Sequence, residues 1–134
     1  MRPSLAALLP LPVALVAPLP LVGCSSEPEF AEVRIVSTTW NGWDPDYEPT
    51  TTTSTLLPAE GEDTVVGCGV TMTVVGVERD RVLLRSDESL APVGDAGGIS
   101  LRDTQREVEV AVGEVVEMST ATTDGGCRFE LSAG

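Results

Sequence analysis

The side chains that could carry chemistry in this chain are of few kinds. The sequence contains no histidine and no lysine, so the usual nucleophile–base pairs of hydrolases and the imidazole-containing zinc and copper sites cannot be built. The remaining groups are carboxylates, hydroxyls, backbone oxygens and the thiols of Cys24, Cys68 and Cys127. This inventory predicts that the protein is not an enzyme, with a carboxylate-dependent hydrolase as the remaining catalytic alternative.

An acidic stretch offers the one candidate for metal binding. Asp44, Asp46 and Glu48 occupy alternate positions, and hard oxygen donors at this spacing are typical of the start of a calcium loop. The EF-hand pattern is not completed, because its glycine position holds Pro49 and its final glutamate position holds Thr55. Two alternatives stay open: a looser calcium site that adds backbone carbonyls, or a solvated acidic loop. We expect no other cofactor.

Trp40, Trp43 and Tyr47 are three of the five aromatic residues, and they lie in a stretch otherwise composed like a linker. Exposed aromatic rings stack on sugars or anchor protein partners, because they offer large, rigid contact areas. The alternative is that the rings fold back as a small hairpin over an open edge of the core. These residues are the best candidates for contact with a glycan or a partner.

The apolar N-terminal stretch ends in Leu21-Val22-Gly23-Cys24 and is followed by polar residues. This run resembles the lipobox of bacterial lipoproteins. The resemblance implies a signal peptide over 1–23, fatty chains such as palmitate on Cys24, and attachment to the membrane from the extracytoplasmic side. The alternatives are a leader cleaved without lipidation or an uncleaved apolar tail, since the stretch contains prolines that disfavour a helix.

The number of cysteines predicts a disulfide once the lipobox is accepted. With Cys24 acylated, Cys68 and Cys127 remain as one pair, and in an extracytoplasmic compartment that pair is expected to be oxidised. Cys68 is in phase with the apolar alternation around it, as is Cys127 with Phe129 and Leu131. We therefore expect both cysteines to point toward one core.

The formal net charge of −13 constrains the partners. Such a surface repels phosphate, so we expect no nucleic-acid binding. It also repels anionic lipid headgroups, so attachment to a membrane must come from the lipid anchor rather than from a basic patch.

The segment 24–63 reads as a lipid-anchored tether. Alternation over 30–37 predicts one strand, at the edge of a sheet formed downstream. From residue 39 the composition changes to prolines, acidic residues and the threonine run Thr50–Thr53. This composition predicts a polar linker, which could be O-glycosylated, with a long ordered loop as the alternative.

The segment 64–134 reads as an all-β domain: a small, disulfide-linked antiparallel β-sandwich or barrel. Short alternating runs are separated by turn residues, and no segment shows helical periodicity over three turns. Inward positions are predicted at Val82 and Leu84, at Val108, Val110 and Val112, at Val116 and Met118, and at Phe129 and Leu131. Gly113-Glu114 is predicted to be a hairpin turn.

Together these features predict a lipid-anchored extracytoplasmic protein of the bacterial cell envelope with a non-catalytic binding or scaffolding role. Its expected partners are the membrane and an envelope protein or glycan. The alternative is a surface module that binds calcium or glycan through residues 40–48.

Overall fold

A computed structural model describes residues 27–134. The predicted leader over 1–23 and the predicted lipidation site Cys24 lie outside these residues. Eight strands and one short 3-10 turn, η1, make up the described chain. In sequence order they are β1 Val33–Asn41, β2 Thr51–Leu56, β3 Asp63–Val65, η1 Gly67–Gly69, β4 Thr71–Val77, β5 Arg81–Pro92, β6 Gln105–Ala111, β7 Val115–Thr120 and β8 Gly125–Ala133.

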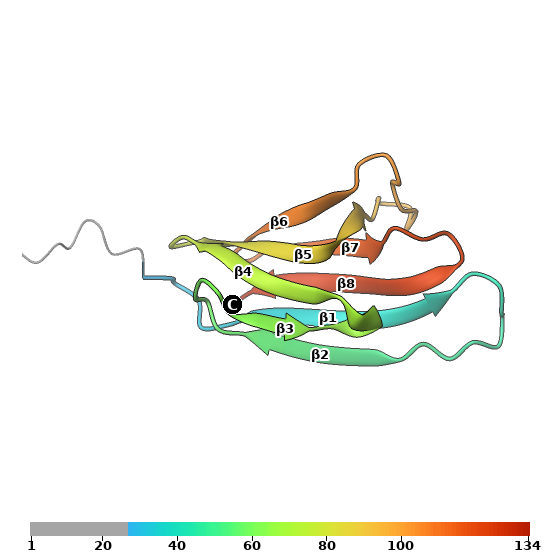
Figure 1. Ribbon diagram of the computed structural model, residues 1–134, viewed down its shortest axis with the longest axis horizontal. Coiled ribbons are helices and arrows are strands. Elements are labelled where there is room, and N and C mark those ends of the chain that lie inside the picture. The colour runs from blue at the N-terminus through green and yellow to red at the C-terminus, as the bar shows by residue number, and fades with distance from the viewer. Residues whose placement is uncertain (1–26) are drawn as a thin grey trace, which may run out of the picture.

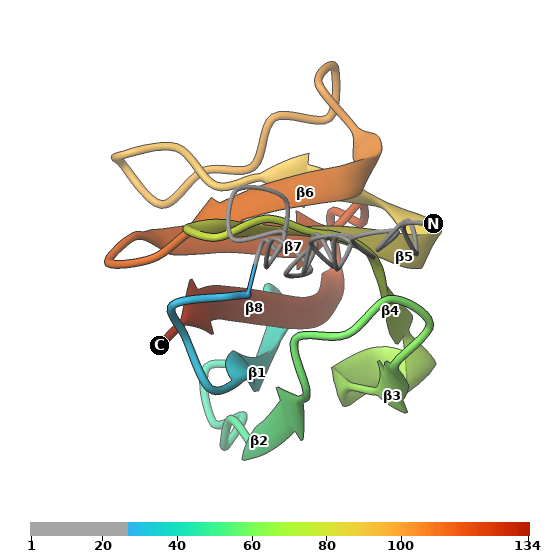
Figure 2. The same cartoon turned by 90° about the vertical axis from the view of Figure 1, so that its left-hand side faces the viewer.

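The strands form one antiparallel sheet that curves into a nearly closed barrel (Figures 1 and 2). The strand order is β2-β1-β8-β7-β5-β4-β3, and β6 pairs with β5 outside this path. The long strand β5 makes the curvature possible: its first half pairs with β4 and β6, whereas Leu90 to Pro92 pair with β7. The all-β prediction is therefore confirmed.

Alternating apolar side chains from opposite strands fill the barrel. Most of the predicted inward positions are fully or almost fully buried, and they form one apolar cluster with residues of β1 and β4. Phe129 is the largest of the fully buried side chains. Val116 is only half-buried against the core. Val112 is exposed, because β6 ends at Ala111 and Val112 lies in the following turn. Burial of these side chains supplies the main driving force for the fold.

Residues of the predicted tether belong to the sheet. β1 extends to Asn41, and it lies between β2 and β8 rather than at an edge. The threonine run forms β2, so a linker is the wrong description of residues 51–56. The physical reason is that β-branched threonine favours extended backbone, although its composition looks like that of a linker. The boundary expected at residue 64 falls inside β3, which pairs with β4.

The turn predicted at Gly113-Glu114 is present, since the amide of Glu114 donates to the carbonyl of Ala111 at 3.1 Å. It does not close a hairpin of paired strands. β6 pairs with β5, whereas β7 pairs with β8 and with the end of β5. The turn therefore joins two strands that do not pair with each other.

The predicted disulfide between Cys68 and Cys127 is confirmed, with a Cα–Cα distance of 6.0 Å. The prediction that both cysteines face the core is wrong for Cys68. Cys127 is buried on β8, but Cys68 is exposed in η1, because β4 begins only at Thr71. The backbone of Cys68 has φ 60°, a left-handed conformation that is unfavourable for a residue with a side chain.

Next to the disulfide, η1 lies directly against the sheet. The amide of Gly67 donates to the buried hydroxyl of Ser37 on β1 at 3.1 Å. A Cβ atom at Gly67 would lie 2.7 Å from the Cβ of Ser37 and 3.1 Å from the sulfur of Cys127. Only glycine fits this close approach without displacing its neighbours.

We predict that Gly67→Ala lowers the free energy of unfolding by about 1–3 kcal/mol, because the added methyl group overpacks the contact between η1 and the sheet. Urea denaturation of the oxidised protein measures this change. Gly98→Ala is the matched control, since a Cβ there meets nothing within 4 Å. Equal stability of the two variants would contradict the close approach.

Candidate functional site

Two loops meet at one end of the barrel. The loop 42–50 joins β1 to β2, and the loop 121–124 joins β7 to β8 (Figure 1). The amide of Gly42 donates to the carbonyl of Asp124 at 3.0 Å, which ties the two loops together. We call this pair of loops the tip. The tip lies at the end of the barrel opposite the C-terminus (Figure 1).

Side chains of the first loop hold its backbone in place. The Asn41 carboxamide oxygen accepts hydrogen bonds from the amides of Trp43 at 2.8 Å and Asp44 at 3.2 Å. The Asp44 carboxylate accepts one from the amide of Asp46 at 2.9 Å, and the Asp44 carbonyl accepts one from the amide of Tyr47 at 3.1 Å. These short-range bonds are typical of Asx turns, so the loop has a defined shape before any ligand binds.

The structure separates the three aromatic candidates. Trp40 lies at the end of β1 and is half-buried, and its indole Nε1 is buried with no hydrogen-bond partner in the described chain. Tyr47 is also half-buried, whereas Trp43 is 74% exposed. The expected alternative, a hairpin that folds back, fits Trp40 and Tyr47 but not Trp43. Trp43 is therefore the ring available for stacking or for contact with a partner.

The acidic candidates Asp44, Asp46 and Glu48 are all exposed. Part of the Asp44 carboxylate is occupied by the turn itself. Within residues 27–134, no group of three or more acidic, histidine or cysteine side chains is placed to hold a metal ion. The calcium site of residues 44–48 stays a prediction.

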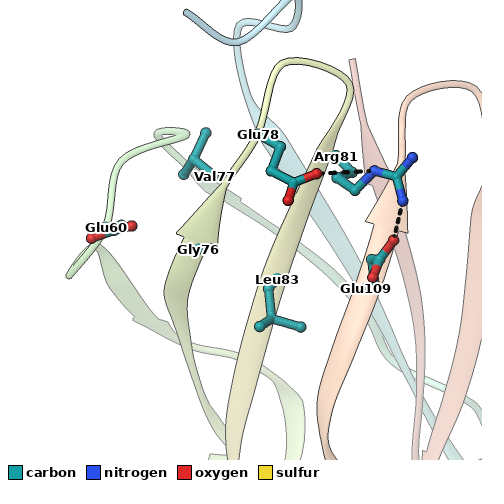
Figure 3. A pocket seen from close by; sticks show the side chains of 7 residues that line it. All are labelled: Glu60, Gly76, Val77, Glu78, Arg81, Leu83 and Glu109. Carbon is teal, nitrogen blue, oxygen red and sulfur yellow. Dashed lines mark hydrogen bonds and ion pairs between the residues drawn. The ribbon is translucent and has the colours of Figure 1, made fainter. Parts of the chain in front are cut away.

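A second feature, absent from the sequence analysis, is an open hollow of about 290 Å³ beside the turn between β4 and β5 (Figure 3). Its polar centre is Arg81, whose guanidinium contacts carboxylates of Glu78 at 3.3 Å, Asp80 at 3.1 Å and Glu109 at 2.7 Å. The hollow is lined by Glu60, Gly76, Val77, Glu78, Arg81, Leu83 and Glu109. Alternation places Arg81 and Glu109 outward, but only the register of β5 with β6 brings them together.

These contacts shift two ionisation equilibria in the hollow. The hydrogen bond from Arg81 holds the pKa of the Asp80 carboxyl below its usual range. Hydrogen bonds to Asp80 and then to Glu109 raise the pKa of Arg81. Arg81 stays charged, and each of its three side-chain nitrogens already donates a hydrogen bond to Asp80 or Glu109.

Neither a family model, nor a curated protein, nor a solved structure matches this chain. In residues 27–134 there is no helix with the length and apolar character needed to cross a membrane.

We predict that Arg81→Gln raises the pKa of Asp80 toward the ordinary value of an aspartate, because the hydrogen bond that lowers it is lost. A carboxyl group whose pKa is lower in the folded than in the unfolded protein stabilises the fold at pH values above its unfolded pKa, which is about 3.9 for an aspartate. This stabilisation is lost as the pH falls from that value through the folded pKa. The variant should therefore lose less stability than the parent over that acid range.

A ¹³C titration of the side-chain carboxyls measures the shift. Arg85→Gln is the control, because Arg85 contacts Glu107 and not Asp80. An unchanged pKa of Asp80 in Arg81→Gln would contradict the assigned cause.

Proposed function

We propose that this chain is a lipid-anchored extracytoplasmic protein of the bacterial cell envelope, and that it binds a partner through the tip without catalysing a reaction. The single observation that supports the binding role is the exposure of Trp43. This large aromatic ring is 74% exposed on a loop with a defined shape. A rigid, exposed aromatic side chain loses little conformational entropy on binding and gains a large contact area.

The geometry of the barrel supports an anchor at the N-terminus. The described chain begins at the end opposite the tip, where the amide of Ala31 donates to the carbonyl of Gly134 at 3.1 Å. β1 is nine residues long, so it separates the two ends by roughly 30 Å. Acyl chains on Cys24 would hold the near end at the membrane and direct Trp43 away from it.

The disulfide supports an extracytoplasmic location for the protein. Disulfides persist in oxidising extracytoplasmic spaces and are rare in the cytosol of most organisms. The bond between Cys68 and Cys127 also leaves Cys24 as the third cysteine of the chain, available for acylation.

The lipid anchor makes a direct prediction. The protein purified from its native envelope should partition into the detergent phase of a phase-separating detergent, and Cys24→Ser should move it to the aqueous phase, because the acyl chains supply the membrane affinity. Thr104→Ser is the control, since it changes one exposed side chain and keeps both Cys24 and the disulfide. Identical partitioning of Cys24→Ser and the parent would contradict the anchor.

Binding at the tip is tested separately by photo-crosslinking in cells. A benzophenone side chain placed at position 43 should give a defined crosslinked product, because this position is the expected centre of the contact. The same group at position 115 is the control, since Val115 is 62% exposed but lies at the other end of β7. Asn41→Ala, which removes two hydrogen bonds from the loop, should weaken the product at position 43.

Equal crosslinking from positions 43 and 115 would contradict binding by the tip. Glycan binding is the alternative favoured by the same exposed ring. A saturable change in the Trp43 fluorescence on titration with cell-wall glycan fragments would identify it, and Trp43→Ala should abolish that change.

A further inference from the structure

The strand β2 ends the sheet on one side, with β1 as its one neighbour in the described strand order. Next to β2, the amide of Thr39 donates to the carbonyl of Thr50 at 2.9 Å. In an antiparallel ladder the bonded positions alternate, so the backbone groups of Thr51, Thr53 and Thr55 point away from β1. Within residues 27–134, no strand, turn or side chain hydrogen-bonds to the backbone of these three residues.

The other two free edges of the sheet carry features that hinder strand addition. β3 has three residues and begins with the charged Asp63. β6 carries Arg106, Glu107 and Glu109. Short edge strands and charged side chains are the usual means by which proteins keep their sheet edges unpaired.

β2 lacks these features. Its sequence, Thr-Thr-Thr-Ser-Thr-Leu, contains no charge, no proline and no glycine, although the chain has 21 acidic residues. β-branched threonine also favours strand pairing. The edge of β2 is therefore neutral and regular in a protein that is otherwise strongly acidic.

Part of this edge is open to solvent. β2 has six residues and the facing strand β3 has three, and Figure 1 shows β2 reaching beyond β3 toward the tip. Thr51, Thr52 and Thr53 are all exposed. The backbone groups of Thr51 and Thr53 therefore lie in the exposed part of this edge.

We propose that β2 pairs antiparallel with β2 of a second copy of this chain, so that the sheets of the two copies become continuous across a two-fold axis. Two identical strands paired in this way present the same donors and acceptors to each other, which makes the edge self-complementary. Threonine side chains opposite one another add favourable cross-strand contacts. Because the edge is uncharged, the contact itself brings no two carboxylates together.

Sedimentation equilibrium of the purified Cys24→Ser protein, in which no acyl chain can cause association, tests the proposal. The average mass should rise from that of one chain to that of two as the concentration rises from micromolar to millimolar. Thr53→Lys should raise the dissociation constant by about tenfold or more, since like charges meet across the new strand pair. This variant lowers the net repulsion between two acidic chains, so weaker association cannot come from net charge.

Thr104→Lys is the control, because it makes the same change in an exposed loop before β6 and should leave the association unchanged. Thr53→Pro is a second variant. It removes an amide that points away from β1, so the β1–β2 ladder remains, and it should also weaken association by about tenfold.

Amide hydrogen exchange supplies a readout specific to the pairing. At high protein concentration the amides of Thr51 and Thr53 should become protected, whereas the amide of Thr52 is already bonded to β1 and should change little. A single mass at all concentrations would overturn the proposal. Protection of backbone amides only in the tip, or only in residues 112–115, would also overturn the proposal. Protection of β2 that appears only when another envelope protein is added would overturn it too.

Discussion

The bond between Cys68 and Cys127 is the constraint on which the barrel depends. Within residues 27–134, the two ends of the sheet, β2 and β3, face each other without pairing, so hydrogen bonds between the described strands do not close the barrel. η1 immediately precedes β4 near one end of the strand order, and β8 lies two strands from the other end. The disulfide therefore links covalently two parts of the sheet that the hydrogen-bonded ladder leaves open, and the hydrogen bond from Gly67 to Ser37 supports this link. A cross-link over 59 positions stabilises a small domain by about 4 kcal/mol in the chain-entropy model.

The antiparallel pair of β1 and β8 carries this constraint to the tip. The two strands pair at every position from Val33 with Ala133 to Asn41 with Gly125. The loops that follow them are consequently held side by side, and the bond from Gly42 to Asp124 completes their connection. Trp43 is thus exposed on a rigid support, which is the condition under which a single aromatic ring contributes most to binding.

Charge is distributed unevenly over the sheet. Arg81 and Arg85 on β5 are matched by Glu109 and Glu107 on β6, so that side of the barrel is covered by ion pairs that are exposed and individually weak. β2 is uncharged along its whole length. High net charge opposes association, and along β2 no charged side chain adds to that repulsion.

The sequence alone determined most of the buried strand positions, and together with the lipobox resemblance it predicted which two cysteines pair. Alternation identifies Val82 and Leu84, and likewise Phe129 and Leu131, as buried residues, because successive side chains in a strand point to opposite faces. Only the tertiary structure decided that the threonine run is a strand, that β6 and β7 pair with other strands, and that Cys68 lies in an exposed turn. These outcomes depend on pairing between segments distant in the chain. A local pattern specifies the faces of a strand, but its neighbours and register come from the packing of the whole barrel.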